Sequence, residues 1–162
     1  LGMLDLAGIP LMAGERADHH PLVAAGGPVC FNPEPMAEFI DFFFIGEAEE
    51  AIPEIITAIR DGQGKPRPER LRRMAQVPSV YVPSLYDPQT RRPLADGVPE
   101  RVVARHTKKL DTSHYPAKPI LPMIEITHDR VAVRSCAAVR RGAGFVRPAK
   151  STNRSASVRP GK

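Results

Sequence analysis

The chain has 162 residues, enough for one domain of ordinary size, and its 18 prolines and 12 glycines exclude a helical bundle. It has neither a run of roughly 18 apolar residues, as a membrane span needs, nor a basic and apolar leader, so we expect a cytoplasmic protein. The net charge of +5 is uneven: residues 134–162 hold eight Lys and Arg and no acid, which leaves 15 basic against 18 acidic residues, or −3, in residues 1–133.

The first elements along the chain are a helix end and two strands. Leu1 to Ile9 has apolar residues at helical spacing with a stop at Gly8 and Pro10, and because it begins without Met we expect the chain to start inside a larger protein or in a truncated open reading frame. Residues 21–27, "PLVAAGG", and residues 40–46, "IDFFFIG", are short apolar runs typical of adjacent parallel strands buried on both faces. Residues 28–39 leave room for a loop and one or two helical turns.

A helix is predicted over residues 49–61, followed by proline-rich sequence. Its apolar side chains share one face, which indicates core packing: Ala48, Ala51, Ile52, Ile55, Ile56 and Ile59. A basic connector follows at residues 62–75, and then three β-like pieces, "SVYVPSLYD", "RVVARHTKKLD" and "PILPMIEITHDRVAV". Proline inside the first and third pieces predicts edge or irregular strands.

We therefore expect an α/β fold with three regions. Residues 1–65 form a partial Rossmann- or flavodoxin-like parallel sheet with helices, residues 66–133 a proline-rich, irregular β-rich connector, and residues 134–162 a disordered basic tail. Because the sheet would lack an earlier strand, an exposed apolar edge should cause poor solubility or self-association.

Histidines and cysteines offer no metal-binding spacing. Asp18 and His20 match part of the Asp-x-His-x-x-Gly signature of cobalamin-binding domains, but Val23 occupies the glycine position, so we interpret them as a surface loop. Cys30 and Cys136 are 106 positions apart and fit neither a zinc site nor a disulfide framework, which predicts reduced thiols.

Glycines follow both predicted strands. Gly26 and Gly27 follow the first strand, and Gly46 with Glu47 follows the second, where an open α/β sheet places its ligand-binding loops. The alternative is structural: glycine provides the backbone freedom for a turn, and an acid at a helix start is favoured by the helix dipole.

The order of these pieces carries more information than any one of them. "MLDLAGIPL", "GGP…NPEP…D…IGEAEE", "VPSVYVPSLYD" and "IEITHDRVAV" together closely resemble the N-terminal region of radical SAM proteins with a cobalamin-binding-like domain, over residues 1–133. The resemblance implies a 4Fe–4S cluster and S-adenosylmethionine for the family, with cobalamin as a further cofactor in question. It also implies cofactor-binding positions at the strand ends: Gly26, Gly27, Pro28, Asn32, Glu34, Gly46 and Glu47, together with the motif residues Pro33, Pro35, Asp41 and Glu49.

The tail departs from the family. Its members continue after "HDRVAV" with a Cys-x-x-x-Cys-x-x-Cys loop, in which three thiolates hold the cluster, whereas this chain has Cys136 alone. Deleting one base from GC-rich codons for the family's Glu-Val-Met-Arg-Gly-Cys gives residues 134–139, and the same shift through Cys-Arg-Phe-Cys-Gln-Ala-Gly-Lys gives residues 143–150, with one extra codon needed between them. We hypothesise a frameshift after Val133.

Two classes of function remain open. The chain is either the N-terminal part of a radical SAM enzyme that is not catalytically competent alone, or a free-standing α/β binding module whose basic tail contacts nucleic acid. Phe145 is the only aromatic residue among the basic residues of the tail, so a stacking platform for single strands is absent and we favour a solvated tail that does not bind nucleic acid. We expect no catalytic residues, metal or cofactor on this chain itself, an unidentified substrate for the family, and no membrane partner.

Overall fold

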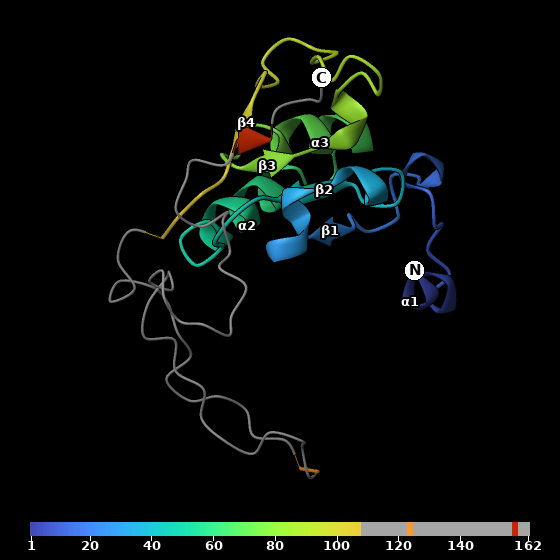
Figure 1. Cartoon of the computed structure of the whole chain (residues 1–162). Helices are drawn as coiled ribbons and strands as arrows, with labels where there is room; N and C mark the ends of the chain where they lie inside the picture. Colours follow the sequence, from blue (N-terminus) through green and yellow to red (C-terminus); the bar gives the residue numbers. More distant parts are fainter. Residues whose placement is uncertain (108–122, 125–156, 159–162) are drawn as a thin grey trace.

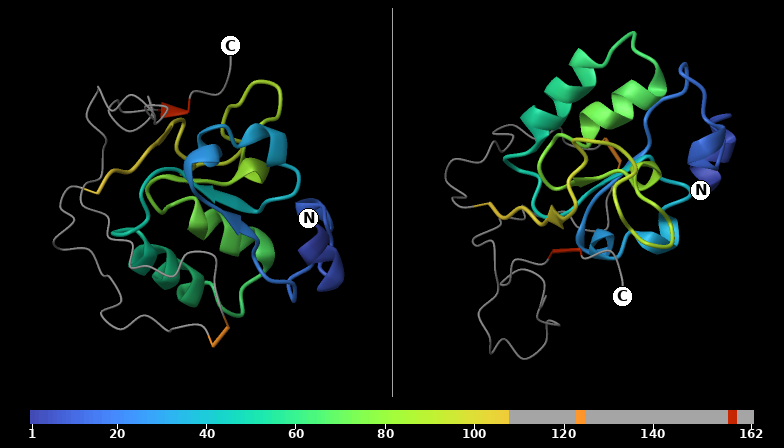
Figure 2. Two further views of the ribbon diagram at one scale, coloured as in Figure 1. Left: turned by 60° about the horizontal axis from the view of Figure 1, so that its bottom comes forward. Right: turned by 90° about the horizontal axis from the view of Figure 1, so that it is seen from above.

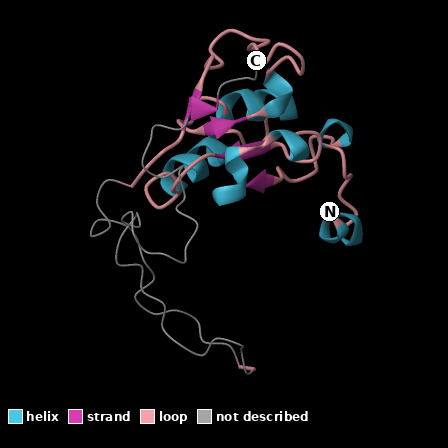
Figure 3. Ribbon diagram, in the orientation of Figure 1, coloured by secondary structure: helices cyan, strands magenta, loops and turns pink. Residues whose placement is uncertain are grey.

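A computed structural model describes residues 1–107, 123–124 and 157–158 as a mixed α/β arrangement (Figures 1 and 3). Its helices are α1 (Gly2–Leu6), α2 (Ile52–Asp61) and α3 (Arg67–Met74), and its strands are β1 (Ala24–Ala25), β2 (Phe42–Phe44), β3 (Val80–Tyr81), β4 (Val102–Val103) and β5 (Ser157–Val158). Short 3₁₀ helices are η1 (Ala13–Glu15), η2 (Pro28–Phe31), η3 (Glu34–Met36) and η4 (Pro83–Leu85). Within the described residues, no helix is long and apolar enough to cross a membrane.

The main sheet has three strands in the order β1-β2-β3. β1 and β2 are parallel, with Ala24 opposite Phe42, which confirms the predicted pair of adjacent parallel strands. β3 runs antiparallel to β2, with Phe43 opposite Tyr81, so the described sheet is mixed and the Rossmann-like arrangement is not confirmed. β3 lies at the edge of this sheet, as Pro83 just after it predicted.

Helix α3 explains the direction of β3. A single helix after β2 would return the chain to the amino end of the sheet and give a parallel strand. A second helix reverses the chain again, so β3 enters antiparallel. We predicted only a basic connector at residues 62–75, and this was wrong, because α3 begins after Pro66 and ends at Met74 within that stretch. Its pattern is weak because Arg fills four of its eight positions, although Arg72 and Arg73 in the last turn are favoured by the helix dipole.

Both faces of β2 are buried, as its unbroken apolar run predicted. Phe42 and Phe44 pack with α2, α3 and β3 on one face, where Ile55, Met74 and Val80 are buried. Phe43 lies on the other face with Ile45, Tyr81, Tyr86, Val98 and Val102. Figure 2 shows α2 and α3 side by side on one face of the sheet.

The apolar face of α2 is only partly core. Ala51 and Ile55 are buried, but Ile52, Ile56 and Ile59 are 47, 42 and 37% exposed. Our prediction that the whole stripe packs in the core was therefore wrong for these three isoleucines. A helix that lies on one sheet buries only the side chains that point toward the sheet. Because α3 covers only one flank of α2, the three isoleucines stay partly exposed.

The rest of the predicted β-rich region is partly described. β4 lies within "RVVARHTKKLD", as expected, whereas "PILPMIEITHDRVAV" falls outside the described residues apart from Met123 and Ile124. The tail, residues 134–162, also falls outside them apart from β5, so its predicted disorder stays a prediction.

Candidate functional site

The structure brings the two predicted glycine loops to one edge of the sheet. Gly26 and Gly27 follow β1, and Gly46 and Glu47 follow β2 after one further residue. Because β1 and β2 are parallel, both loops leave from the same edge of the sheet, the one at which the carboxyl ends of β1 and β2 lie. Gly27 has φ +102° and Gly46 has φ +119°, conformations that residues with a Cβ rarely adopt.

The loop after β1 is exposed. A Cβ added at Gly26 or Gly27 would meet nothing within 4 Å, so their backbone can be approached closely from outside. Gly27 precedes η2, which starts at Pro28, and Asn32 ends η2 with an exposed side chain. Of the predicted binding residues, Gly26, Gly27, Pro28 and Asn32 are thus those with room for a ligand.

The loop after β2 is filled by the chain itself. A Cβ at Gly46 would lie 2.1 Å from the carbonyl oxygen of Arg105 and 2.6 Å from its nitrogen. The Glu47 amide donates to that carbonyl at 2.9 Å, and Oε2 of Glu47 accepts from the Thr107 amide at 2.7 Å. These contacts bind residues 105–107 to the end of β2, as the structural alternative for Gly46 and Glu47 requires.

Glu34 is held between two distant elements. Oε1 accepts from the Tyr81 hydroxyl at 3.0 Å, and Oε2 forms an ion pair with Arg91. Burial raises the pKa of Tyr81 above its ordinary value, and the Glu34 charge adds to this. Tyr81 therefore stays a hydrogen-bond donor at any physiological pH.

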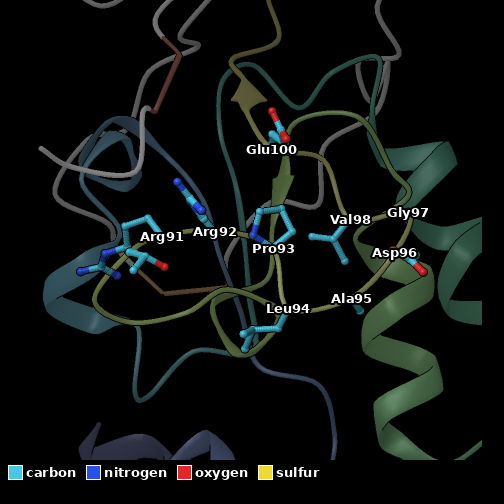
Figure 4. Close-up of a pocket in the computed structure, with 10 residues that line it drawn as sticks. Arg91, Arg92, Pro93, Leu94, Ala95, Asp96, Gly97, Val98 and Glu100 are labelled. Carbon is cyan, nitrogen blue, oxygen red and sulfur yellow. The ribbon is translucent and has the colours of Figure 1, made fainter.

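A cavity of about 870 Å³ adjoins this cluster. It is lined by residues 90–98 and Glu100, and Figure 4 shows that loop curving around it from Arg91 to Asp96 and Gly97. The side chains of Arg92, Leu94 and Asp96 are exposed. The structure thus places Glu34 against the wall of a wide and shallow hollow through its ion pair with Arg91.

Asp41 does not belong to this edge, because it precedes β2 and lies at the opposite end of the strand. Its Oδ2 accepts from Arg16 Nη1 at 2.9 Å and from the Val23 amide at 2.6 Å, and lies 2.7 Å from Arg67 Nη2. The three charged side chains are 7% exposed or less. The resemblance grouped Asp41 with the strand-end residues; its position instead makes it the centre of a buried ion cluster.

Sequence reasoning missed Arg16 and Arg67. Arg16 also donates to the carbonyls of Pro10, Leu11 and Phe39, and Arg67 to those of Ala17, His20 and Pro21. One signal was present: an acid directly before a buried apolar run needs a partner. Nothing local identified which of the many arginines supplies it.

The Asp18–His20 pair forms a loop before β1, as predicted. Asp18 Oδ1 accepts from the Arg67 amide at 2.6 Å, and Nδ1 of His20 accepts from the Ala17 amide at 2.9 Å. Both residues therefore lie at the amino end of β1, away from the edge with Gly26 and Gly46.

The protonation of His20 should be displaced to lower pH. Desolvation lowers the pKa of His20 below its ordinary value, and the charges of His19 and Arg67 lower it further. The folded state thus favours the neutral ring, so its contribution to stability is present above pH of about 6.5 and is lost as the pH falls through the lowered pKa. We expect an NMR titration to show His20 protonating at lower pH in the folded chain than in urea; equal midpoints would contradict this.

The residues that the structure describes do not fit a 4Fe–4S cluster. Cys30 is buried, and burial raises the pKa of its thiol, which disfavours the thiolate that binds iron. In the part of the chain that the structure describes, no group of three or more His, Cys, Asp or Glu side chains is placed to hold a metal ion. The only other cysteine of the sequence, Cys136, lies outside the described residues.

The described residues form a small α/β module around a mixed three-stranded sheet. The family described as radical SAM proteins, N-terminal, matches residues 1–83, half of the chain. The chain belongs to this family, whose members use a 4Fe–4S cluster and S-adenosylmethionine. No curated protein and no solved structure shows significant similarity to the chain.

Proposed function

We propose that the chain supplies the N-terminal, ligand-binding-like part of a radical SAM protein and does not perform the radical chemistry by itself. The observation that carries this is the family match over residues 1–83, combined with a sequence that holds two cysteines. A cluster that leaves one iron open for S-adenosylmethionine needs three thiolates. Two cysteines, of which Cys30 is buried among apolar side chains, do not meet that requirement.

The binding surface that we propose is the exposed loop after β1. Gly26, Gly27 and Asn32 offer backbone and amide groups with open space in front of them. Gly46, Glu47 and Glu34, which the resemblance also implies, contact residues 105–107 and Arg91 instead, so we assign them to holding the fold together. The unidentified ligand would thus meet mainly backbone amides.

The purified chain should carry no iron and cleave no S-adenosylmethionine. We expect iron reconstitution under anaerobic conditions to leave no charge-transfer absorption of an iron–sulfur cluster, and incubation with S-adenosylmethionine and a strong reductant to release no 5′-deoxyadenosine. A Cys30→Ala, Cys136→Ala variant is the matched control and should give the same result. Stable iron–sulfur absorption that this variant loses would refute the proposal.

Cobalamin should bind weakly or not at all. Asp18 and His20 already bond to Arg67 and Ala17, at the end of β1 away from the glycine loops. Titration with hydroxocobalamin, followed by absorbance, should give no saturable change. A stoichiometric change that His20→Ala abolishes would show that this histidine is an axial ligand after all.

We further propose that the tail after Val133 arose from a frameshift. With GC-rich codons chosen for the cysteine-loop sequence that the resemblance implies, one shifted frame gives fourteen residues of the tail, 134–139 and 143–150. On this view Cys136 and the basic residues of the tail were not selected for binding nucleic acid. Sequencing the gene tests this: a region in which no frame encodes Cys-x-x-x-Cys-x-x-Cys over residues 134–150 would end the hypothesis.

A further inference from the structure

β4 lies outside the three-stranded sheet and pairs with a segment from the far end of the chain. Val102 is opposite Val158 and Val103 is opposite Ser157 in an antiparallel pair. Figure 1 shows β5 in red beside the yellow segment that contains β4, and the second view of Figure 2 agrees. We propose that the outer edge of β4 is a docking site for an extended peptide segment, and that the chain's own Ser157–Val158 segment is its occupant.

The position of β4 is fixed independently of β5. Val102 is 5% exposed and packs in the core with Ile45 and Tyr86. Ahead of β4, the Tyr86 hydroxyl donates to the carbonyl of Pro99 at 2.7 Å. An extended segment therefore meets an edge that is already in place, which reduces the ordering that binding requires.

Arg105, which follows β4, fixes the chain at the carboxyl end of that strand. The Arg105 amide donates to the Ile45 carbonyl at 3.0 Å, and its guanidinium donates to both carboxylate oxygens of Glu54 at 2.7 and 2.8 Å. This bidentate pair raises the pKa of Arg105 and lowers that of Glu54, so both stay charged at neutral pH. β4 is consequently clamped at both ends.

The surroundings of β4 suit a peptide rather than a small polar ligand. Val103 alternates with the buried Val102 and is 47% exposed. A cavity of about 650 Å³ beside it is lined by residues 75–80, which follow α3, and by residues in and next to β4, including Val77, Val102 and Ala104. An added strand would bond through its backbone and place alternate side chains against these apolar groups.

Two considerations favour the chain's own segment as occupant. A tethered segment has a high effective concentration at a site that it can reach. Pairing through backbone atoms also demands an extended conformation rather than a chosen sequence, so it holds whether or not the tail is a frameshift product. The inference therefore does not depend on the proposed function.

Hydrogen exchange of the full chain tests this proposal. In an antiparallel pair, alternate amides point at the partner strand, so one of the amides of Val102 and Val103 should be protected by β5. We expect the double substitution Ser157→Pro, Val158→Pro to raise exchange at that amide by about tenfold or more. The matched control, Ser151→Pro with Thr152→Pro, should leave the exchange rate at that amide unchanged. The exchange rate at the amide of Ile45 should be the same in every variant.

Further variants separate the occupants. A chain ending at residue 153 should exchange as fast as the proline variant, and adding a peptide of residues 154–162 should restore protection. Exchange at Val102 and Val103 that is the same in all variants would overturn the proposal. Protection that disappears on dilution would assign the occupant to a second copy and overturn the intramolecular assignment.

Discussion

Replacing Asp41 by Asn is expected to lower the free energy of unfolding by about 3 to 5 kcal/mol, the usual cost of leaving a buried charge without its partner. The side chains of Arg16 and Arg67 are 0% and 7% exposed, and Asp41 is the carboxylate between them. Asn keeps the size of the side chain and can still accept from the Val23 amide. The loss therefore reports the missing charge rather than a cavity.

Urea unfolding at neutral pH measures this effect. Asp96→Asn is the matched control, because Asp96 is exposed on the loop around the larger cavity and should change stability by less than about 0.5 kcal/mol. Equal unfolding midpoints for the two variants would show that the carbonyl oxygens around the arginines satisfy them without Asp41. The cluster would then have no dominant role in joining residues 10–21 to α3.

The elements predicted from sequence were those with a strong local signal. "DFFFI" is apolar at every position after Asp41, so burial on both faces of β2 could be expected without knowing its neighbours. Helix α2 was likewise recognised from its period and its stop at Gly62. Such signals fix an element but not the direction of the strand that follows.

The direction of β3 depended on α3, whose few apolar residues, Leu71 and Met74, gave a weak pattern. Tertiary contacts identify that helix, because Arg67 at its start forms an ion pair with Asp41 and Met74 at its end is fully buried. Neither contact can be inferred from a window of ten residues. The Rossmann-like expectation failed to be confirmed for this reason.

The candidate site shows the same division. Glycines after both strands were predicted from turn chemistry, and both strand-end pairs lie at one edge. The partner of Glu34 is 57 positions away, and that of Glu47 is 60 positions away. Because such long-range pairs leave no local pattern, sequence reasoning could not tell which motif residues face a ligand and which hold the chain together.

Gly46→Ala should distinguish those two roles. The added methyl group would lie 2.1 Å from the carbonyl oxygen of Arg105, which is backbone and cannot rotate away, and φ at Gly46 is +119°. Strain at such a backbone position and overpacking each cost about 1 to 3 kcal/mol, so we expect a loss of about 2 to 6 kcal/mol in the free energy of unfolding. Faster hydrogen exchange at the Arg105 amide should accompany it, because its bond to Ile45 would open.

Gly26→Ala is the matched control, since it adds the same methyl group at the same edge of the sheet where nothing lies within 4 Å. It should leave both stability and the exchange of Arg105 unchanged. If Gly46→Ala were equally silent, residues 105–107 would not be bound to β2 as described, and Gly46 with Glu47 would return to the set of exposed ligand-binding positions. If only Gly46→Ala is destabilising, the glycine and the acid after β2 serve the fold, and the search for a bound ligand narrows to the loop that begins at Gly26.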